Sequence, residues 1–179
     1  MITKTSGWQN TEIKEKKNRL TSGMRAVMNW ATLEEHDSVL DLFCRDGALL
    51  SALCEKLRLN VCGICQDVQY SRELRERLYN SDIVFAEPDD IPWRDGAFDA
   101  VLAGELIKKE NAERVLCETN RVLKPGGQAV ILTKIFCGKK DIYPEKKELM
   151  RLMESSGFDH VSWRLSGIWG VAVGWKTGE

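Results

Sequence analysis

The fold is decided by the stretch Val39-Leu-Asp-Leu-Phe-Cys-Arg-Asp-Gly-Ala-Leu-Leu50. An apolar run passes through a short polar corner and continues into an apolar stretch with helical spacing. This pattern is typical of a buried parallel strand followed by the first turn of a helix. In doubly wound α/β folds a nucleotide-like ligand binds at such a corner, where backbone N–H groups are free to donate. The corner has one glycine, Gly47, whereas Phe43 and Arg45 replace the bare backbone that such a site usually offers.

Strands and helices alternate beyond this corner. We predict strands at 39–43, 60–65, 83–86, 98–103 and 128–133, and helices at 48–59, 71–78, 111–123 and 144–155. Lys124-Pro-Gly-Gly127 would end the helix at 111–123, and two β-rich runs, 158–165 and 168–175, predict an antiparallel hairpin. The fold class is therefore α/β: a doubly wound, mostly parallel seven-stranded sheet with helices on both faces and a C-terminal hairpin. The ligand crevice is expected at the carboxyl ends of the first strands.

Length and composition predict a single domain over residues 1–179, with 1–10 frayed and 11–32 forming an N-terminal helical cover. Apolar and charged residues make up 43% and 30% of the chain, and the net charge is −1. Such a charge gives no reason to expect nucleic acid or a membrane surface as a partner. The sequence shows neither a membrane-spanning run nor a signal peptide, so we expect a cytoplasmic protein.

Two downstream blocks resemble one known family. They are Ala86-Glu-Pro-Asp-Asp-Ile-Pro-Trp-Arg-Asp-Gly-Ala-Phe-Asp-Ala-Val101 and Glu118-Thr-Asn-Arg-Val-Leu-Lys-Pro-Gly-Gly127, and Gly157-Phe158 fits the same pattern. The chain resembles the class I S-adenosylmethionine-dependent methyltransferases, in particular the compact group related to ubiquinone/menaquinone-biosynthesis enzymes. The resemblance extends from about Leu20 to Lys176. It implies a methyltransferase that uses S-adenosylmethionine and acts on a small molecule.

The resemblance also implies a set of cofactor-binding residues. The family's acid and three alternate glycines fall on Asp41, Phe43, Arg45 and Gly47. The acid that accepts both ribose hydroxyls falls on Cys65, a thiol that cannot make two such bonds, so Gln66 or Asp67 is a candidate substitute. Near the adenine the family's acid corresponds to Glu87. The full predicted set is Asp41, Phe43, Arg45, Gly47, Cys65, Gln66, Glu87, Pro88 and Gly104, with no catalytic base identified and no metal expected.

Several of these residues have two interpretations. Asp41 either positions the cofactor or caps the following turn. Phe43 and Arg45 either reshape the pocket, with Arg45 binding a carboxylate, or obstruct a site that is no longer used. The alternative function is therefore a catalytically degenerate methyltransferase-fold protein that acts as a binding or regulatory module. A dinucleotide-dependent oxidoreductase fits less well, because the three-glycine fingerprint is missing.

Other residue types give weaker predictions. Cys62-x-x-Cys65 lacks the second pair of ligands that zinc requires, although Cys44 or Cys65 would be reactive at an exposed strand end. We expect His36 and His160 on the surface, Lys108 and Lys109 in a solvated loop, and the tryptophans in packing roles. The hairpin edge and the tail tryptophans form a candidate homodimer surface.

Overall fold

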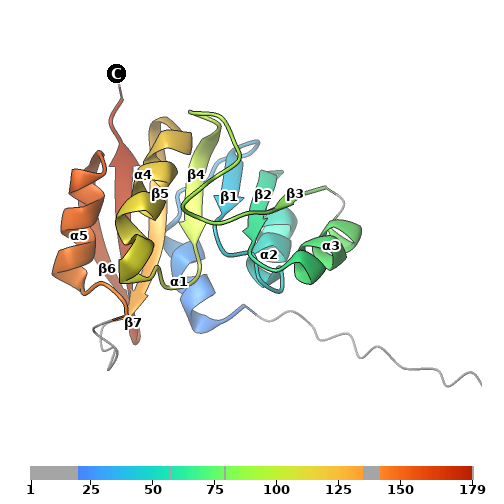
Figure 1. Cartoon of the computed structure of the whole chain (residues 1–179), viewed down its shortest axis with the longest axis horizontal. Coiled ribbons are helices and arrows are strands. Elements are labelled where there is room, and N and C mark those ends of the chain that lie inside the picture. Colours follow the sequence, from blue (N-terminus) through green and yellow to red (C-terminus); the bar gives the residue numbers. More distant parts are fainter. Residues whose placement is uncertain (1–19, 57, 79, 135–141, 179) are drawn as a thin grey trace, which may run out of the picture.

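The computed structural model describes residues 20–178 apart from 57, 79 and 135–141. It contains a seven-stranded sheet with the strand order β3-β2-β1-β4-β5-β7-β6 (Figure 1). The first five strands pair in parallel, and β7 is antiparallel to both of its neighbours. The predicted fold class is confirmed. The strands are β1 (Ser38–Asp41), β2 (Asn60–Cys65), β3 (Asp82–Phe85), β4 (Phe98–Ala103), β5 (Leu123–Lys134), β6 (Phe158–Ser166) and β7 (Trp169–Lys176).

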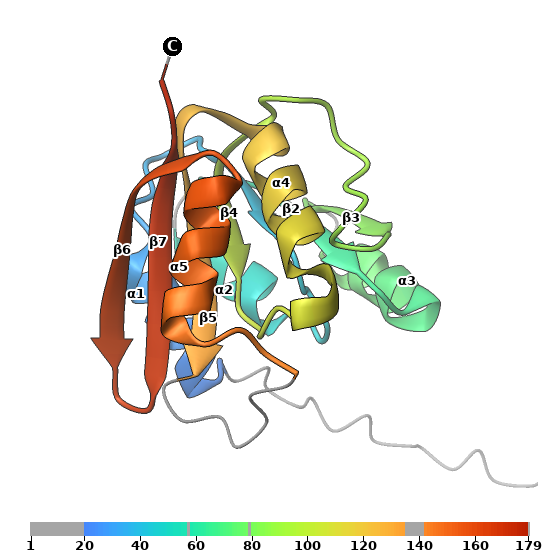
Figure 2. The same ribbon diagram turned by 60° about the vertical axis from the view of Figure 1, so that its left-hand side comes forward.

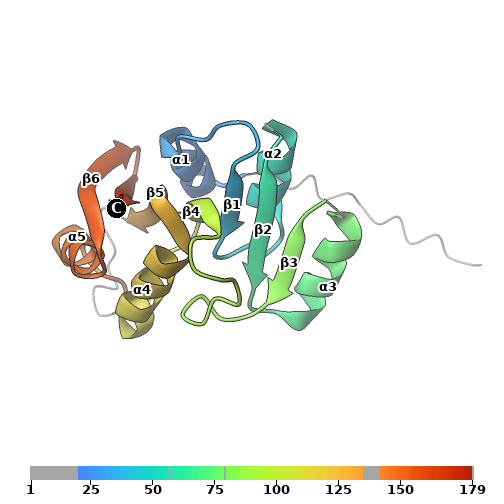
Figure 3. The same ribbon diagram turned by 90° about the horizontal axis from the view of Figure 1, so that it is seen from above.

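Helices cover both faces of the sheet. Seen from above, α1 and α2 lie on one face and α4 and α5 on the other, with α3 beside the edge strand β3 (Figure 3). Successive apolar residues of the strands enter opposite cores, as in Val39 and Leu40 of β1 or Val130 and Ile131 of β5. The sheet is thus buried on both sides, which explains its nearly continuous apolar strands. The helices are α1 (Ser22–Trp30), α2 (Ala48–Lys56), α3 (Val68–Arg77), α4 (Ala112–Val122) and α5 (Lys146–Ser155), with a 3-10 turn, η1 (Lys109–Asn111).

Several element boundaries differ from those predicted, and side-chain caps explain two of them. The prediction started α3 at Ser71, but the Asp67 carboxylate accepts from the backbone N–H groups of Gln69 and Tyr70 and starts the helix at Val68. A capping box between Glu145 and Glu148 likewise starts α5 after Pro144. α1 begins after the Thr21 cap. The predicted segment 11–19 lies outside the described residues.

The fifth strand begins earlier than predicted. Its first residue, Leu123, follows the last residue of α4 directly and pairs with Phe98, whereas the prediction placed the strand at 128–133. The next pair is Ala100 with Gln128, so the intervening residues form an irregularity in the ladder. Lys-Pro-Gly-Gly therefore ends the helix as predicted but belongs to a bulged strand rather than to a free loop.

The connection 86–97 between β3 and β4 contains no helix and passes alongside α4 (Figure 2). This connection leaves the carboxyl end of β3, at the predicted ligand crevice, and reaches the start of β4 at the opposite edge of the parallel sheet. None of the described helices is long and apolar enough to span a bilayer.

Candidate functional site

The carboxyl ends of β1, β2, β3 and β4 meet at one edge of the parallel sheet, and two side-chain contacts link the loops that follow them. Arg45 after β1 forms an ion pair with Glu105 after β4, with 2.6 Å between Nη1 and Oε1. Gln66 after β2 donates its amide N–H to Glu87 after β3. The structure therefore brings the predicted cofactor residues together around the crossover point of the sheet, as expected for this fold.

Asp41 is buried at the end of β1 and only half satisfied. Its Oδ1 accepts from the backbone N–H of Phe43 at 3.1 Å, whereas its Oδ2 has no hydrogen-bond partner among the described residues. Burial, together with the nearby carboxylates of Glu105 and Asp46, raises the pKa of Asp41 to about 7 despite the hydrogen bond from Phe43, which lowers it. The bond to Phe43 turns the chain and explains why β1 ends at Asp41 rather than at Phe43. A single turn bond leaves an orphaned oxygen, so capping alone does not account for this residue.

Phe43 and Arg45 differ in how firmly they are held. The Phe43 ring is half-buried and packs against the core on the α4 side of the sheet. The Arg45 side chain is 69% exposed, and its contact with Glu105 is a surface ion pair. Such pairs typically contribute only about 0–1 kcal/mol. Any obstruction by Arg45 is therefore easily displaced.

The two glycines of the predicted set have packing roles. Gly47 adopts a φ of 74°, and a Cβ atom there would lie 2.5 Å from Cδ2 of Leu74 and 2.8 Å from Nη2 of Arg77. Gly104 is buried, and a Cβ atom there would lie 3.1 Å from Leu49 of α2 and 3.3 Å from Met24 of α1. Gly47 allows close approach of α3, and Gly104 allows α1 and α2 to lie against the end of β4.

The thiols of the crevice are buried, so the predicted exposed, reactive cysteine is wrong. Cys44 and Cys65 are 2% and 1% exposed. Burial, with the charge of Asp41, raises the pKa of the Cys44 thiol. Cys62 packs against the opposite face of the sheet from Cys65, because residues three apart on a strand point in opposite directions. Within the described residues no three potential ligands are grouped for a metal ion.

The residues after β2 and β3 are more polar. The Cys65 thiol donates to the backbone oxygen of Asp67 at 3.3 Å, so it does not stand in for a carboxylate. Gln66 and Glu87 are exposed and paired, and Pro88 is buried beside them in the sequence. The Asp67 carboxylate is occupied by the start of α3, which leaves Gln66 and Glu87 as the polar groups available to a ligand.

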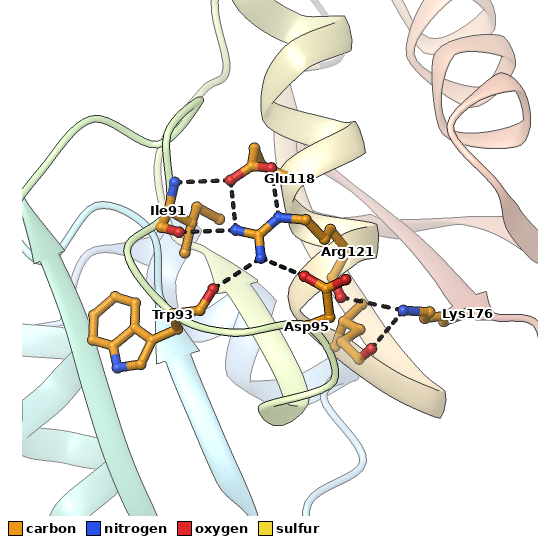
Figure 4. Close-up of polar contacts among 7 residues, drawn as sticks. Ile91, Trp93, Asp95, Glu118, Arg121 and Lys176 are labelled. Atoms are coloured by element: carbon orange, nitrogen blue, oxygen red, sulfur yellow. Dashed lines mark hydrogen bonds and ion pairs between the residues drawn. The ribbon is translucent and has the colours of Figure 1, made fainter.

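Sequence analysis did not identify a polar network on α4 (Figure 4). Arg121 pairs with both oxygens of Glu118 and with Asp95, and donates to the backbone oxygens of Ile91 and Trp93 at 2.8 and 2.9 Å. Glu118 also accepts from the backbone N–H of Ile91 at 2.9 Å. Arg121 lowers the pKa of Glu118. The sequence did show that the blocks 86–101 and 118–127 carry charges of opposite sign. The residues that pair between these blocks are far apart in the sequence, so their contact could not be predicted.

The other residues singled out in the sequence lie on the surface, in an ion pair or against the two cores. His36 and His160 are exposed, as predicted, at positive φ angles of 71° and 50°. Lys108 is exposed, whereas Lys109 is partly buried and pairs with Glu148 of α5 at 2.7 Å. Four tryptophans pack against the two cores, in agreement with the prediction; they are Trp93, Trp163, Trp169 and Trp175.

Sequence comparison assigns the family. The profile of the "Methyltransferase domain" family matches residues 40–131, which run from the second half of β1 into β5. The chain belongs to this family. A similar curated protein is the ubiquinone/menaquinone biosynthesis C-methyltransferase UbiE of Brucella canis, with 24% identity over 186 aligned positions, 82% of this chain and 69% of the enzyme.

Structure comparison agrees on the fold of this methyltransferase-family chain. A chain from the complex between the Haloferax volcanii Trm112 methyltransferase activator and a methyltransferase has a TM-score of 0.77 at 16% identity, covering 90% of this chain and 92% of that one. The [4+2]-cyclase SpnF has a TM-score of 0.71 at 16% identity, covering 87% and 81%. Because a cyclase shares this fold, the fold alone does not determine the reaction.

The residues of this methyltransferase-family site fit most of the cofactor that the family implies. An orphaned buried carboxylate oxygen at Asp41 suits a cationic amino group, and the paired Gln66 and Glu87 offer acceptors for hydroxyls or an adenine amino group. Cys65 is the exception, because its buried thiol cannot accept two short hydrogen bonds. The fit is therefore good at the amino-acid end and altered at the ribose.

Proposed function

We propose that this chain is an S-adenosylmethionine-dependent methyltransferase acting on an apolar small molecule. The main support is Asp41, whose Oδ2 is buried without a partner at the carboxyl end of β1. Keeping such a group costs folding free energy in the absence of a ligand. A ligand ammonium group would satisfy it. The carboxylates of Glu105 and Asp46 close to Asp41 add to the attraction for a cation.

Three parts of the site would contribute to cofactor binding. Asp41 would hold the amino group, Gln66 with Glu87 the adenosine, and the turn around Gly47 would shape the crevice, with the N–H groups of Gly47 and Ala48 donating within the turn. When bound, the cofactor supplies a methyl group activated by its sulfonium sulfur. The protein's part in such a transfer is to align the reacting atoms and exclude water, so the site does not require a catalytic triad.

A narrow apolar pocket near the end of β5 supports an apolar methyl acceptor by its lining rather than by its size. It lies between the segments that follow β4, the end of β5 and the start of α5, and its free volume of about 10 Å³ is too small for a ring unless the lining moves. Thr133 and Tyr143 provide the only hydroxyl groups of its lining, which also includes Leu106, Ile107, Ile131, Leu132, Pro144 and Leu149. The quinone-modifying relatives are consistent with a ring-shaped acceptor.

Calorimetry with S-adenosylhomocysteine and S-adenosylmethionine tests the cofactor. We expect micromolar binding of both ligands to wild type and at least tenfold weaker binding to Asp41→Asn. The exposed Asp82→Asn serves as a matched control, because it removes an acid from the far end of β3. The absence of binding to wild type at millimolar ligand would refute the methyltransferase proposal.

The acceptor is tested separately by methyl transfer to a small hydroquinone and to a small aliphatic amine. We expect transfer to the hydroquinone alone. Leu106→Phe should crowd this apolar lining and lower kcat/KM for the hydroquinone about tenfold, while leaving S-adenosylhomocysteine affinity unchanged. Equal activity on the amine would contradict an apolar acceptor.

One observation favours a second function, a binding or regulatory module without catalysis. Arg45 bridges the loops after β1 and β4, and Cys65 replaces the expected ribose-binding acid. Calorimetry separates the two functions, because a module of this kind would bind neither cofactor form.

A homodimer through the hairpin is a further proposal, supported by Leu165 and Ile168, which are 64% and 65% exposed at its tip. Sedimentation of wild type and Leu165→Ser with Ile168→Ser tests it, with loss of a dimer expected in the double variant.

A further inference from the structure

The connection 86–97 is irregular, and five of its backbone groups have partners on α4. The backbone N–H of Ile91 donates to the Glu118 carboxylate, and the carbonyls of Ile91 and Trp93 accept from Arg121. Further along, the N–H groups of Gly96 and Ala97 donate to the last carbonyls of α4, at 3.1 and 2.7 Å. α4 therefore supplies hydrogen-bond partners to a segment that has no helix or strand of its own.

The contacts of α4 extend toward the cofactor crevice. Arg114, Glu118 and Arg121 are four and three residues apart, so they lie on one face of the helix. Arg114 forms an ion pair with Asp89, whose side chain is only 13% exposed. Asp90 donates its backbone N–H to the carbonyl of Glu87 at 3.1 Å, which closes a turn around Pro88. The face formed by these three α4 residues is thus connected to Glu87 through one ion pair and one turn.

The geometry points to Arg114, Glu118 and Arg121 as positioning residues for the cofactor. By holding residues 89–97 against α4, they fix the turn that presents Glu87 and Pro88 at the crevice. This inference rests on the proposed function, because it assigns Glu87 to the adenosine end of the ligand. The three residues do not touch the ligand themselves.

The chemistry of Arg121 suits this role. Its planar guanidinium makes five contacts of 2.7 to 2.9 Å with four different residues, two of them through backbone carbonyls. Lysine has a single point charge and cannot reproduce this fork. Glu118 accepts from Nε and Nη2 along one edge of the guanidinium and holds it in place. Lys176 of β7 donates to the carbonyls of Arg121 and Leu123, which also fastens the end of α4 to the sheet (Figure 4).

Amide hydrogen exchange and calorimetry with S-adenosylhomocysteine test the inference in the full chain. Arg121→Lys should increase exchange in the peptide 86–97 and weaken binding, each by about tenfold. Arg114→Gln should increase exchange mainly at 87–90 and weaken binding about threefold, without lowering the urea midpoint, because Arg114 is 73% exposed. Arg114→Lys should restore both values.

Arg94→Gln is the matched control. Arg94 lies in the same connection and is exposed, so its loss should change neither exchange nor affinity. Wild-type exchange and wild-type affinity in folded Arg121→Lys and Arg114→Gln would overturn the inference. So would equal losses in Arg94→Gln.

Amide hydrogen exchange and calorimetry together distinguish this inference from the proposed function. If wild type fails to bind the ligand, the function is refuted, and exchange alone decides whether α4 positions the connection. Increased exchange in Arg121→Lys and Arg114→Gln supports that positioning, whereas unchanged exchange overturns it.

Discussion

Two carboxylates, Glu118 on α4 and Asp41 at the end of β1, have opposite surroundings. Glu118 on α4 accepts three hydrogen bonds, two from Arg121 and one from Ile91, and its pKa is lowered. Asp41 at the end of β1 accepts one, leaves its other oxygen orphaned, and has its pKa raised to about 7. The first carboxylate stabilises the fold, and the second weakens it. A residue that binds a ligand is expected to destabilise the ligand-free fold, as Asp41 does.

Breaking the Glu118 network should have the largest effect. Glu118→Ala leaves Arg121 and the Ile91 N–H without their main partner, so we expect the free energy of unfolding at pH 7 to fall by about 3 kcal/mol. Because the folded-state pKa of Glu118 lies below its ordinary 4.5, its stabilisation is present above pH 4.5 and is lost as the pH falls through the folded value. Urea unfolding should therefore show a smaller difference between wild type and variant at pH 3. A constant difference across pH would contradict the charge-based account.

Replacing Asp41 should raise the free energy of unfolding, whereas replacing Glu118 should lower it. Because the folded-state pKa is raised above 3.8, the ionised group destabilises the ligand-free fold fully above about pH 7 and not at all below pH 3.8. We expect Asp41→Asn to raise the free energy of unfolding by about 2 kcal/mol at pH 8 and by little at pH 4. Thermal unfolding at both pH values measures this change. A variant that is less stable at pH 8 would indicate a structural Asp41.

The same titration should appear in ligand binding. A ligand ammonium favours the ionised carboxylate, so S-adenosylhomocysteine affinity should decrease as the pH falls below about 7. Between pH 8 and pH 6 we expect about a tenfold loss in wild type and no comparable loss in Asp41→Asn. Calorimetry in buffers of different ionisation enthalpy should also detect proton release on binding near pH 7. Identical pH profiles for the two proteins would exclude direct contact between Asp41 and the ligand.

Removing Arg45 should change stability little, and its effect on ligand binding should show whether Arg45 obstructs the crevice or binds the ligand. Its ion pair with Glu105 is exposed, so Arg45→Ala should lower the free energy of unfolding by less than about 1 kcal/mol. If Arg45 obstructs the crevice, ligand binding to the variant should tighten about threefold; if it binds the ligand carboxylate, binding should weaken about tenfold. Arg72→Ala, on the exposed side of α3, controls for net charge. We expect tightening, because the pair spans the two loops.

The thiols should show the smallest functional effect. Native alkylation should modify the exposed Cys54 and Cys117 first and leave the buried Cys44 and Cys65 unmodified until the chain unfolds. Mass spectrometry of the labelled peptides measures this order, and ligand affinity should not change after the first two modifications. Rapid modification of Cys44 would mean that the crevice opens in solution.

Prediction from sequence succeeded for features that depend on local pattern. Strands β2 and β4 match their predicted ranges, because their apolar residues continue to the ends of the strands. Errors arose where a side-chain cap or a strand pairing determined a boundary, as with the cap from Asp67 or the pairing of Leu123 with Phe98. The predicted exposed thiol failed for a similar reason, since the burial of Cys44 depends on packing beside Cys65.

The sequence by itself determined the order of strands and helices, the family and the position of the crevice, because these follow from the spacing of apolar residues and from contiguous motifs. Tertiary structure alone decided how the residues of the crevice are paired. Arg45 meets Glu105 sixty residues away, and Arg121 meets Trp93 twenty-eight residues away. Hydrogen bonds and desolvation depend on distances in space that spacing along the chain does not encode. For that reason Asp41 and Glu118 could be recognised in the sequence only as acids, whereas the opposite shifts of their pKa values follow from the folded structure.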